Sequence, residues 1–255
     1  MTRPAQPGLA VVLAVGLVVA AGTAGAQEIT LSLGGEAAGG DPGSLAERTI
    51  QIIALVTLLS LVPGLVMMIT CFPFLVTVLS ILRMAIGLQQ SPPNMLIVSL
   101  ALFLTYFVME PVFAQAWAEG LLPLTEGRMP AEEALPLALG PFRTFMAARM
   151  DPGTFTELAA LRALPGEALP LPAPEASLSI LVPSFLLSEI QRAFEIGFLV
   201  FLPFLIIDLV VAAILMSMGM MMVPPAVVSL PFKLAFFVVA DGWTLLAGAL
   251  VRSYM

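Results

Sequence analysis

The residues most able to do chemistry are charged side chains that lie in an apolar stretch, from Pro183 to Lys233. These are Glu189, Arg192, Glu195, Asp208 and Lys233. An ionisable side chain at the depth of a bilayer costs roughly 2.5 to 3.5 kcal/mol by insertion measurements, so it normally faces a partner, a bundle interior or a wet cavity. We therefore interpret this stretch as the wall of an internal feature in a membrane protein.

The spacing of these residues suggests two kinds of pairing. Glu189, Arg192 and Glu195 follow one another at three-residue intervals, so on a helix we expect them to share a face and to pair within one copy or between copies. A solvated helix end is the alternative. Asp208 and Lys233 lie deeper in apolar sequence and are predicted to form a buried ion pair. A proton-relay role for Asp208 is less favoured. The chain has no histidine, and a proton relay through the membrane needs more than one titratable group.

Methionines crowd the end of the longest uncharged part of this stretch. They are Met216, Met218, Met220, Met221 and Met222. Methionine is unbranched and polarizable, so a ring of such side chains from several copies could form a deformable seal that excludes water and still yields to varied substrates. Ordinary packing against lipid or helices is the alternative. The better candidates for a pore gasket are the last three.

Composition places the chain among integral membrane proteins. Of 255 residues, 60% are apolar and 11% charged, and the mean hydropathy is +1.05. The formal net charge of -7 argues against a nucleic-acid partner. The chain has no histidine and a single cysteine, Cys71. This composition argues against the usual zinc sites and catalytic triads and excludes an intrachain disulfide. With no Walker-type nucleotide-binding run either, we expect no enzyme and no cofactor.

The beginning of the chain looks like an export signal. A basic residue, an apolar core and Ala24-Gly25-Ala26 predict a secretory signal peptide over residues 1–26, with an uncleaved first helix as the alternative. Residues 27–48 are polar and show no period, which predicts a flexible external arm. The mature chain would then begin outside the cytoplasm.

The remaining chain is predicted to be all-α and polytopic, built of kinked helical hairpins. Residues 49–118 form the first apolar hairpin, residues 119–177 a partly helical extracytoplasmic insertion, and residues 178–255 the second hairpin. Proline removes a helical hydrogen bond, so breaks or kinks are expected at its positions. Within the first apolar run these are Pro63-Gly64 and Pro73, and within the insertion Pro136 and Pro141.

A glycine followed by a proline pair occurs at two of the predicted turns. Gly87 precedes Pro92-Pro93 by the same spacing as Gly219 precedes Pro224-Pro225, which indicates either a duplicated hairpin or coincidence. Both turns are expected on the cytoplasmic side. The last apolar segment, residues 226–251, is followed by Tyr254, which suits an interfacial end.

Three stretches resemble the FliP family of flagellar export-gate proteins and its counterparts in virulence-type type III secretion. They are LRMAIGLQQSPPNMLIVSLALFLTYFVME (residues 82–110), PSFLLSEIQRAFEIG (183–197) and PFLIIDLVVAAILMSMGMMMVPPAVVSLPFK (203–233), with Asp241-Gly242-Trp243 after them. The resemblance covers most of the mature chain. A cleavable signal peptide is more typical of the flagellar branch, so the virulence-type branch is the second reading.

The resemblance implies a core channel subunit of the export gate in the bacterial inner membrane, within the flagellar basal body. Several copies would assemble with FliQ, FliR, FlhB and FlhA family proteins, in contact with membrane lipid, into a helical passage for unfolded export substrates. A secondary transporter with a midplane site, or a scaffold that only nucleates basal-body assembly, are rival functions.

Overall fold

The computed structural model describes residues 42–87, 93–163, 174–220 and 222–255. All regular elements in these ranges are helices, so the predicted all-α class is confirmed. The chain divides into two units, Met1–Val66 and Met67–Met255. The predicted signal peptide, the external arm before Pro42 and most of the Pro-rich end of the insertion lie outside the described residues.

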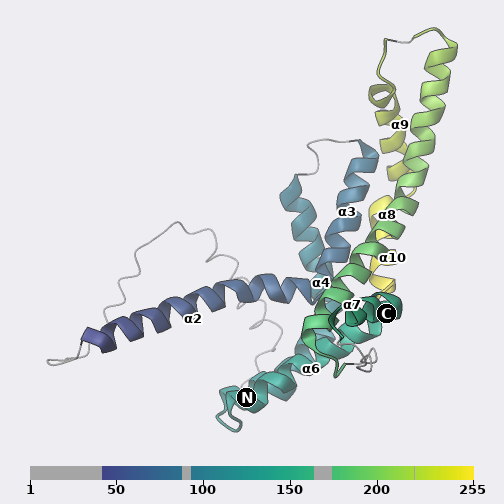
Figure 1. Ribbon diagram of the computed structural model, residues 1–255. Coiled ribbons are helices and arrows are strands. Elements are labelled where there is room, and N and C mark those ends of the chain that lie inside the picture. Colours follow the sequence, from purple (N-terminus) through teal and green to yellow (C-terminus); the bar gives the residue numbers. More distant parts are fainter. Residues whose placement is uncertain (1–41, 88–92, 164–173, 221) are drawn as a thin grey trace, which may run out of the picture. The chain divides into compact units, whose positions relative to one another are not determined.

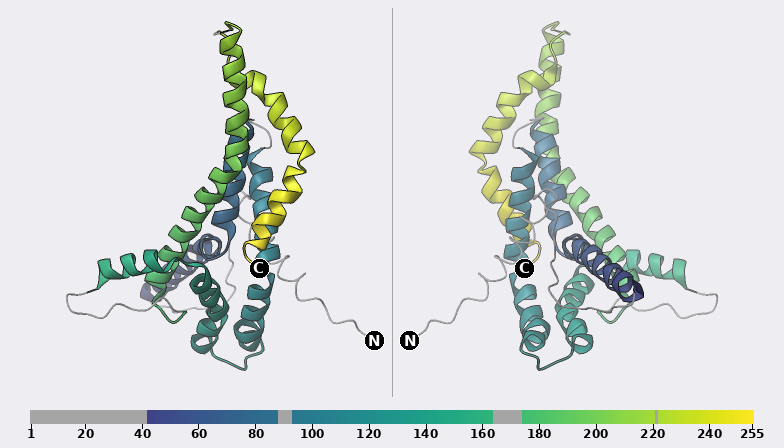
Figure 2. Two further views of the ribbon diagram at one scale, coloured as in Figure 1. Left: turned by 90° about the vertical axis from the view of Figure 1, so that its right-hand side faces the viewer. Right: turned by 90° about the vertical axis from the view of Figure 1, so that its left-hand side faces the viewer.

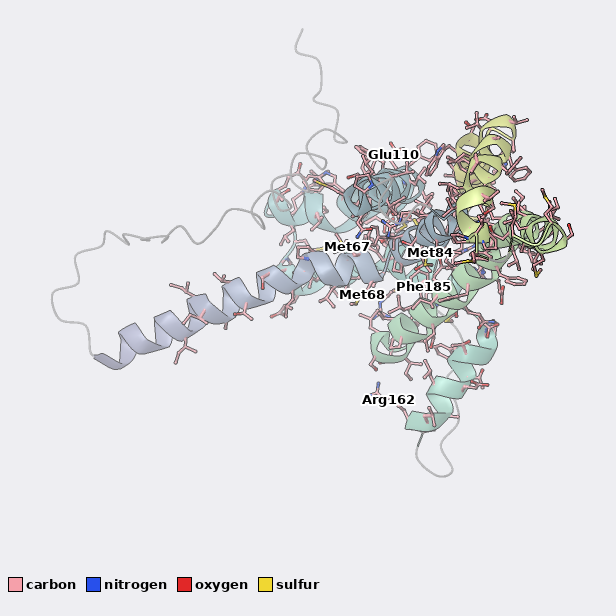
Figure 3. The ribbon with its side chains drawn as sticks, turned by 90° about the horizontal axis from the view of Figure 1, so that it is seen from above. Met67, Met68, Met84, Glu110, Arg162 and Phe185 are labelled. Carbon is pink, nitrogen blue, oxygen red and sulfur yellow. The ribbon has the colours of Figure 1, made fainter. Side chains whose placement is uncertain are left out.

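The described part of the first unit is helix α2 (Pro42–Met68), apart from the last two residues of that helix. It begins seven residues before the expected boundary at residue 49 and continues through Pro63, so this proline does not break it. Apolar side chains such as Ile50, Val56 and Leu65 are exposed along its length. Figure 3 shows side chains projecting from more than one side of α2. A helix that is apolar on several sides requires cover from lipid or protein.

The core of the second unit is formed by α3 (Phe72–Ile86), α4 (Asn94–Ala116) and α8 (Leu178–Ser217), which lie side by side (Figure 1). Helix α3 begins at the predicted proline break, because Pro73 lies in its first turn, where a missing N–H costs nothing. Helix α8 packs closely on α3, since a Cβ on Gly197 would lie 2.4 Å from Cδ1 of Ile81.

Helix α8 is one continuous helix of 40 residues that contains Pro183 and Pro203. It is about 60 Å long at 1.5 Å per residue, which is twice the ~30 Å hydrocarbon core of a bilayer, so it is longer than one untilted crossing requires. Two helical stretches, Asn94–Thr125 and Leu178–Ser217, are long and apolar enough to span a membrane, and up to four spans result if two bent helix pairs are counted. These findings confirm a polytopic membrane protein.

The insertion is largely helical. Helix α4 passes into a π-helical turn, η1 (Trp117–Leu121), and a short α5 (Leu122–Thr125), and then come α6 (Ala131–Arg149) and α7 (Pro152–Arg162). The expected interruptions do not occur, because α6 runs through both Pro136 and Pro141. A second core joins α6, α7 and α8 through buried side chains that include Met146, Phe155, Leu181 and Phe185.

The last apolar segment is bent where one span was expected. Helices α9 (Pro225–Val239) and α10 (Gly242–Arg252) meet at 62°, and we call them the α9–α10 arm (Figure 2). Asp241, at the bend, has a left-handed backbone conformation with φ 49°, which is uncommon for a residue with a side chain. Gly242 is required there, since a Cβ would lie 2.2 Å from the ring of Phe237.

The glycines that open the two turns have the same backbone conformation. Gly87 and Gly219 follow α3 and α8 with φ of 88° and 74°, the left-handed conformation that ends helices. Pro93 and Pro224 are the residues just before α4 and α9. The repeated sequence pattern therefore corresponds to a repeated helix-end geometry at both hairpins.

Candidate functional site

Lys233 joins three helices around one carboxylate. Its Nζ on α9 lies 2.6 Å from Oδ2 of Asp208 on α8 and donates to the backbone carbonyl of Ala85, in the last turn of α3, at 3.0 Å. A positive charge at a helix C-terminus is also favoured by the helix dipole. The Lys233 side chain is 6% exposed and that of Asp208 is 33% exposed, so the cation is the more deeply buried partner.

Ser229 completes this group and was missed in the sequence. Its Oγ donates to Oδ1 of Asp208 at 2.5 Å. Ser229 precedes Lys233 by four residues and so lies on the same face of α9, a spacing that could have identified it. The sequence could not have identified Ala85, because only its backbone carbonyl binds Lys233. Each carboxylate oxygen of Asp208 therefore has a donor within the chain.

A second group surrounds Glu189, whose side chain is fully buried. We call it the Glu189 cluster, and it consists of Arg149, Glu189, Arg192, Ser253 and Tyr254. Arg149 Nε lies 3.2 Å and Arg192 Nη1 3.5 Å from Oε1, and the Tyr254 hydroxyl donates to Oε2. A buried carboxylate is tolerated only with such partners. The three donors come from α6, from α8 itself and from the residues after α10.

Arg149 is the most connected member of the Glu189 cluster. Its Nη1 donates to the Ser253 carbonyl at 2.7 Å, and its guanidinium lies 4.0 Å above the centre of the Tyr254 ring, which adds a cation–π contact. Arg192 Nη1 in turn donates to the Arg149 carbonyl at 3.3 Å. Burial, and then the nearby Glu189 carboxylate, raise the pKa of the Tyr254 phenol, so Tyr254 acts as a donor to that carboxylate.

Glu195 lies apart from the Glu189 cluster, although it was expected to share its face. It is exposed and accepts a hydrogen bond from Gln191 Nε2 at 3.1 Å. Each step of three residues turns about 300° around an α-helix, so two steps carry Glu195 some 120° away from Glu189. The three-residue spacing therefore brings Glu189 and Arg192 together, but it does not place Glu195 on the same face of the helix.

The candidate gasket methionines that the structure describes lie in the last turn of α8, as Met216 does, and in the turn that follows the helix. Gly219 N donates to Met216 O and Met220 N to Leu215 O, both at 3.0 Å, which is the Schellman pattern that ends a helix. Met216, Met218, Met220 and Met222 are all exposed, with Met222 at 99%. Met221 lies outside the described residues. Apolar side chains thus project from a turn that no other described part of this chain covers.

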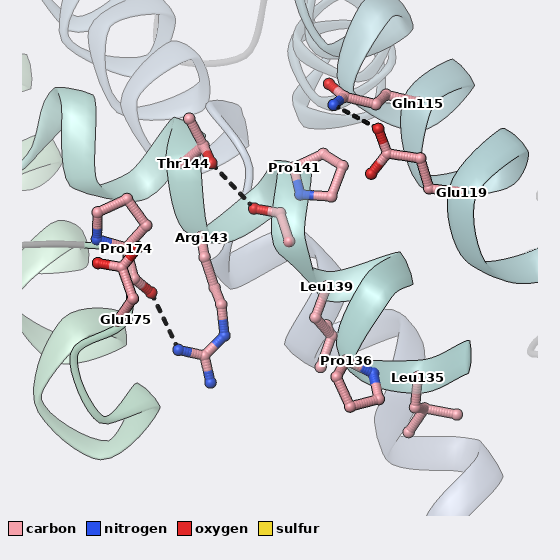
Figure 4. A pocket seen from close by; sticks show the side chains of 11 residues that line it. Gln115, Glu119, Leu135, Pro136, Leu139, Pro141, Arg143, Thr144, Pro174 and Glu175 are labelled. Atoms are coloured by element: carbon pink, nitrogen blue, oxygen red, sulfur yellow. Dashed lines mark hydrogen bonds between the residues drawn. The ribbon is translucent and has the colours of Figure 1, made fainter. Parts of the chain in front are cut away.

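Two concave regions are also present, one in the insertion and one beside the Asp208–Lys233 pair. A pocket of about 580 Å³ between the end of α4, α6 and the turn at Pro174 includes Arg143 (Figure 4). Arg143 Nη1 donates to the carbonyls of Pro174 and Ala176 at 3.0 and 2.9 Å. A wholly apolar groove of about 400 Å³ runs between α8 and α9. Among the described residues, no group of three or more His, Cys, Asp or Glu side chains is arranged to hold a metal ion.

Comparison with known proteins gives a consistent picture. The FliP family model matches residues 55–250. A protein from Caulobacter vibrioides named "Flagellar biosynthetic protein FliP" is 51% identical over 215 residues, which is 84% of this chain and 80% of that protein. Proteins of the same name from Bacillus subtilis and Borreliella burgdorferi are 41% and 38% identical, each over 84% of this chain and over 95% and 84% of their own lengths.

Proposed function

The chain belongs to the FliP family, and from this membership we propose that it is a subunit of the flagellar type III protein export gate in the bacterial inner membrane. Several copies assemble with FliQ, FliR, FlhB and FlhA family proteins into a channel that passes unfolded flagellar subunits. The chain catalyses no bond chemistry and needs no cofactor, and the energy for export comes from other components.

The observation that carries the channel proposal is the exposed methionine turn. Met218, Met220 and Met222 project from the end of a hairpin, while the charged residue nearest to them on α8, Asp208, is held by Lys233 and Ser229. Copies arranged around an axis would bring several such turns together. Unbranched, polarizable side chains there would close around one another and still admit substrates of many shapes.

The proposed orientation follows from the predicted signal peptide. The mature chain begins outside the cytoplasm, the insertion that contains α6 and α7 is extracytoplasmic, and the methionine turn lies toward the cytoplasm. The Glu189 cluster, next to the insertion, then belongs to the outer side, and the complex belongs to the basal body.

The gasket is tested by replacing Met220, Met221 and Met222 together with Ala and measuring ion leakage through membranes that contain the assembled gate. We expect leakage through the closed gate, because three smaller side chains per copy leave the constriction open. Met84→Ala with Met95→Ala is the matched control, since both side chains are exposed but belong to other helices. Unchanged permeability in a triple variant that still assembles would contradict the gasket.

Alternative functions make different predictions. A scaffold that only nucleates the basal body would not touch a substrate, so a stalled export substrate that crosslinks to a photoreactive group at position 221 favours the channel. A secondary transporter would work as a monomer or dimer on a small molecule, so particles of higher helical symmetry would exclude it. An equivalent role in virulence-type secretion is separated by whether loss of the chain abolishes flagella.

A further inference from the structure

The α9–α10 arm is held at two places. Near its start, Ser229 and Lys233 of α9 are bound to Asp208 and to α3. At the far end, Leu250 is the one buried residue of α10, and the two residues after the helix, Ser253 and Tyr254, belong to the Glu189 cluster. Figure 2 shows the arm leaving the upper end of α8, bending, and returning toward the lower part of the unit.

Apolar packing attaches α10 to the rest of the unit through a few side chains, chiefly Leu250, which lies in the main core, and Leu246, which packs against it. Trp243 and Leu245 are exposed, and the edge-to-face contact of Trp243 with Phe237, at 5.3 Å between ring centres, lies within the arm and so does not attach it to the other helices. The bend is at Asp241, a position with an unusual backbone conformation. Since few apolar side chains of α10 reach the core, the position of its end also depends on the polar contacts made just beyond it.

We propose that the Glu189 cluster is a latch that positions the α9–α10 arm, with Arg149 and Tyr254 as its positioning residues. Arg149 reaches both the buried carboxylate of Glu189 and the carbonyl of Ser253, at 3.2 and 2.7 Å. Tyr254 adds a hydroxyl to the same carboxylate, and its ring packs against Phe74 and Phe145, with ring centres 5.4 and 6.1 Å away. Aromatic packing and charged hydrogen bonds therefore act on the same residue.

The latch has a specific mechanical consequence. If the Glu189 cluster is weakened, α10 is released and turns about Asp241, while α9 stays in place because Lys233 and Ser229 still hold it. Loss of general stability would instead loosen both helices. The two behaviours are distinguished by one buried probe in each helix.

The experiment measures thiol labelling of the purified full chain in detergent micelles. The native cysteine is removed with Cys71→Ala, and a single cysteine is placed either at Leu250 in α10, which is 1% exposed, or at Phe237 in α9, which is 8% exposed. Each probe is combined with Tyr254→Phe, which keeps the ring and removes the hydroxyl, or with Arg149→Gln. Thr156→Ala, at an exposed position of α7, is the matched control.

We expect labelling at position 250 to become on the order of tenfold faster in Tyr254→Phe, as the loss of one hydrogen bond to a charged group would predict. Arg149→Gln should accelerate it further, and labelling at position 237 should not change. Equal acceleration at both positions, or none at position 250, would overturn the proposal. If Arg149→Gln fails to fold, the labelling rates of the Tyr254→Phe variant at positions 250 and 237 are sufficient to test the proposal. None of these readouts depends on export, so the latch can fail while the proposed function stands.

Discussion

The ion pair between α8 and α9 should respond unequally to the loss of its two charges. Asp208→Asn keeps the shape of the side chain but leaves the Lys233 ammonium, 6% exposed, without a counter-charge. Removing one partner of a buried pair costs about 3 to 5 kcal/mol, and we expect about 3 because the Ala85 carbonyl still accepts from Nζ. Lys233→Met removes the cation and leaves an acid that is one-third exposed and still bound by Ser229.

The cost of Lys233→Met should therefore be smaller, about 1.5 to 2 kcal/mol, which is the low end of the net value of a hydrogen bond to a charged group, because the acid that remains is partly exposed. The double variant contains neither charge and should be more stable than Asp208→Asn alone, since it leaves no uncompensated buried charge. Denaturant unfolding of the purified full chain in mixed micelles measures all four proteins. Ser217→Ala, at an exposed hydroxyl near the end of α8, controls for general effects of substitution.

Two outcomes would refute this reasoning. If Lys233→Met costs as much as Asp208→Asn, the difference in burial between the two side chains does not govern their energies. If the double variant is less stable than the two single losses combined, the side chains do not stabilise each other directly. Under the proposed function, the same variants should rank in the same order when cell swimming is measured, because assembly of the proposed gate would require the folded hairpin.

Other predictions concern the insertion. Hydrogen bonds from the backbone N–H and hydroxyl of Thr154 lower the pKa of Asp151, which begins α7, so its stabilisation is present above the ordinary pKa of 3.8 and is lost as pH falls through the lower folded value. Asp151→Asn should therefore flatten the acid side of a plot of melting temperature against pH, and an unchanged plot would contradict this. Gly120→Ala should destabilise by about 1 to 3 kcal/mol through overpacking, since its Cβ would lie 2.5 Å from Ala138 N. Gly140→Ala, with no atom within 4 Å of the added Cβ, should be neutral or stabilising by up to about 1 kcal/mol, and equal thermal shifts in both variants would rule out the close contact.

Hydrophobic patterning predicted the all-α class but misjudged the prolines. Pro73 begins a helix as expected, whereas Pro63, Pro136 and Pro141 lie inside helices. A proline removes one N–H and displaces one carbonyl, and in an apolar segment the surrounding helix and its neighbours can absorb that change. Whether a proline ends a helix depends on packing that is not local, so composition alone could not decide it.

Sequence spacing recovered local pairs and missed distant partners. Glu189 and Arg192 are three residues apart and meet, whereas Arg149 and Tyr254 are separated from Glu189 by 40 and 65 residues. Arg149 resembled the other arginines of a polar insertion, and Tyr254 resembled an interfacial aromatic residue. Only the packing of α6 and the arm against α8 makes them neighbours of the buried carboxylate.

The two charge groups also differ in their positions along α8. Glu189 and Asp208 are 19 residues apart, or about 28 Å along the helix, close to the ~30 Å thickness of a hydrocarbon core. From Ile196 to Ile207 the helix contains no charged residue. A bilayer that covers this uncharged part would place the Glu189 cluster at one face and the Asp208–Lys233 pair at the other. Charges near the interfaces cost less than charges at the centre. The two groups of paired charges would therefore be tolerated both in a hairpin that crosses lipid and in one that is enclosed by other subunits.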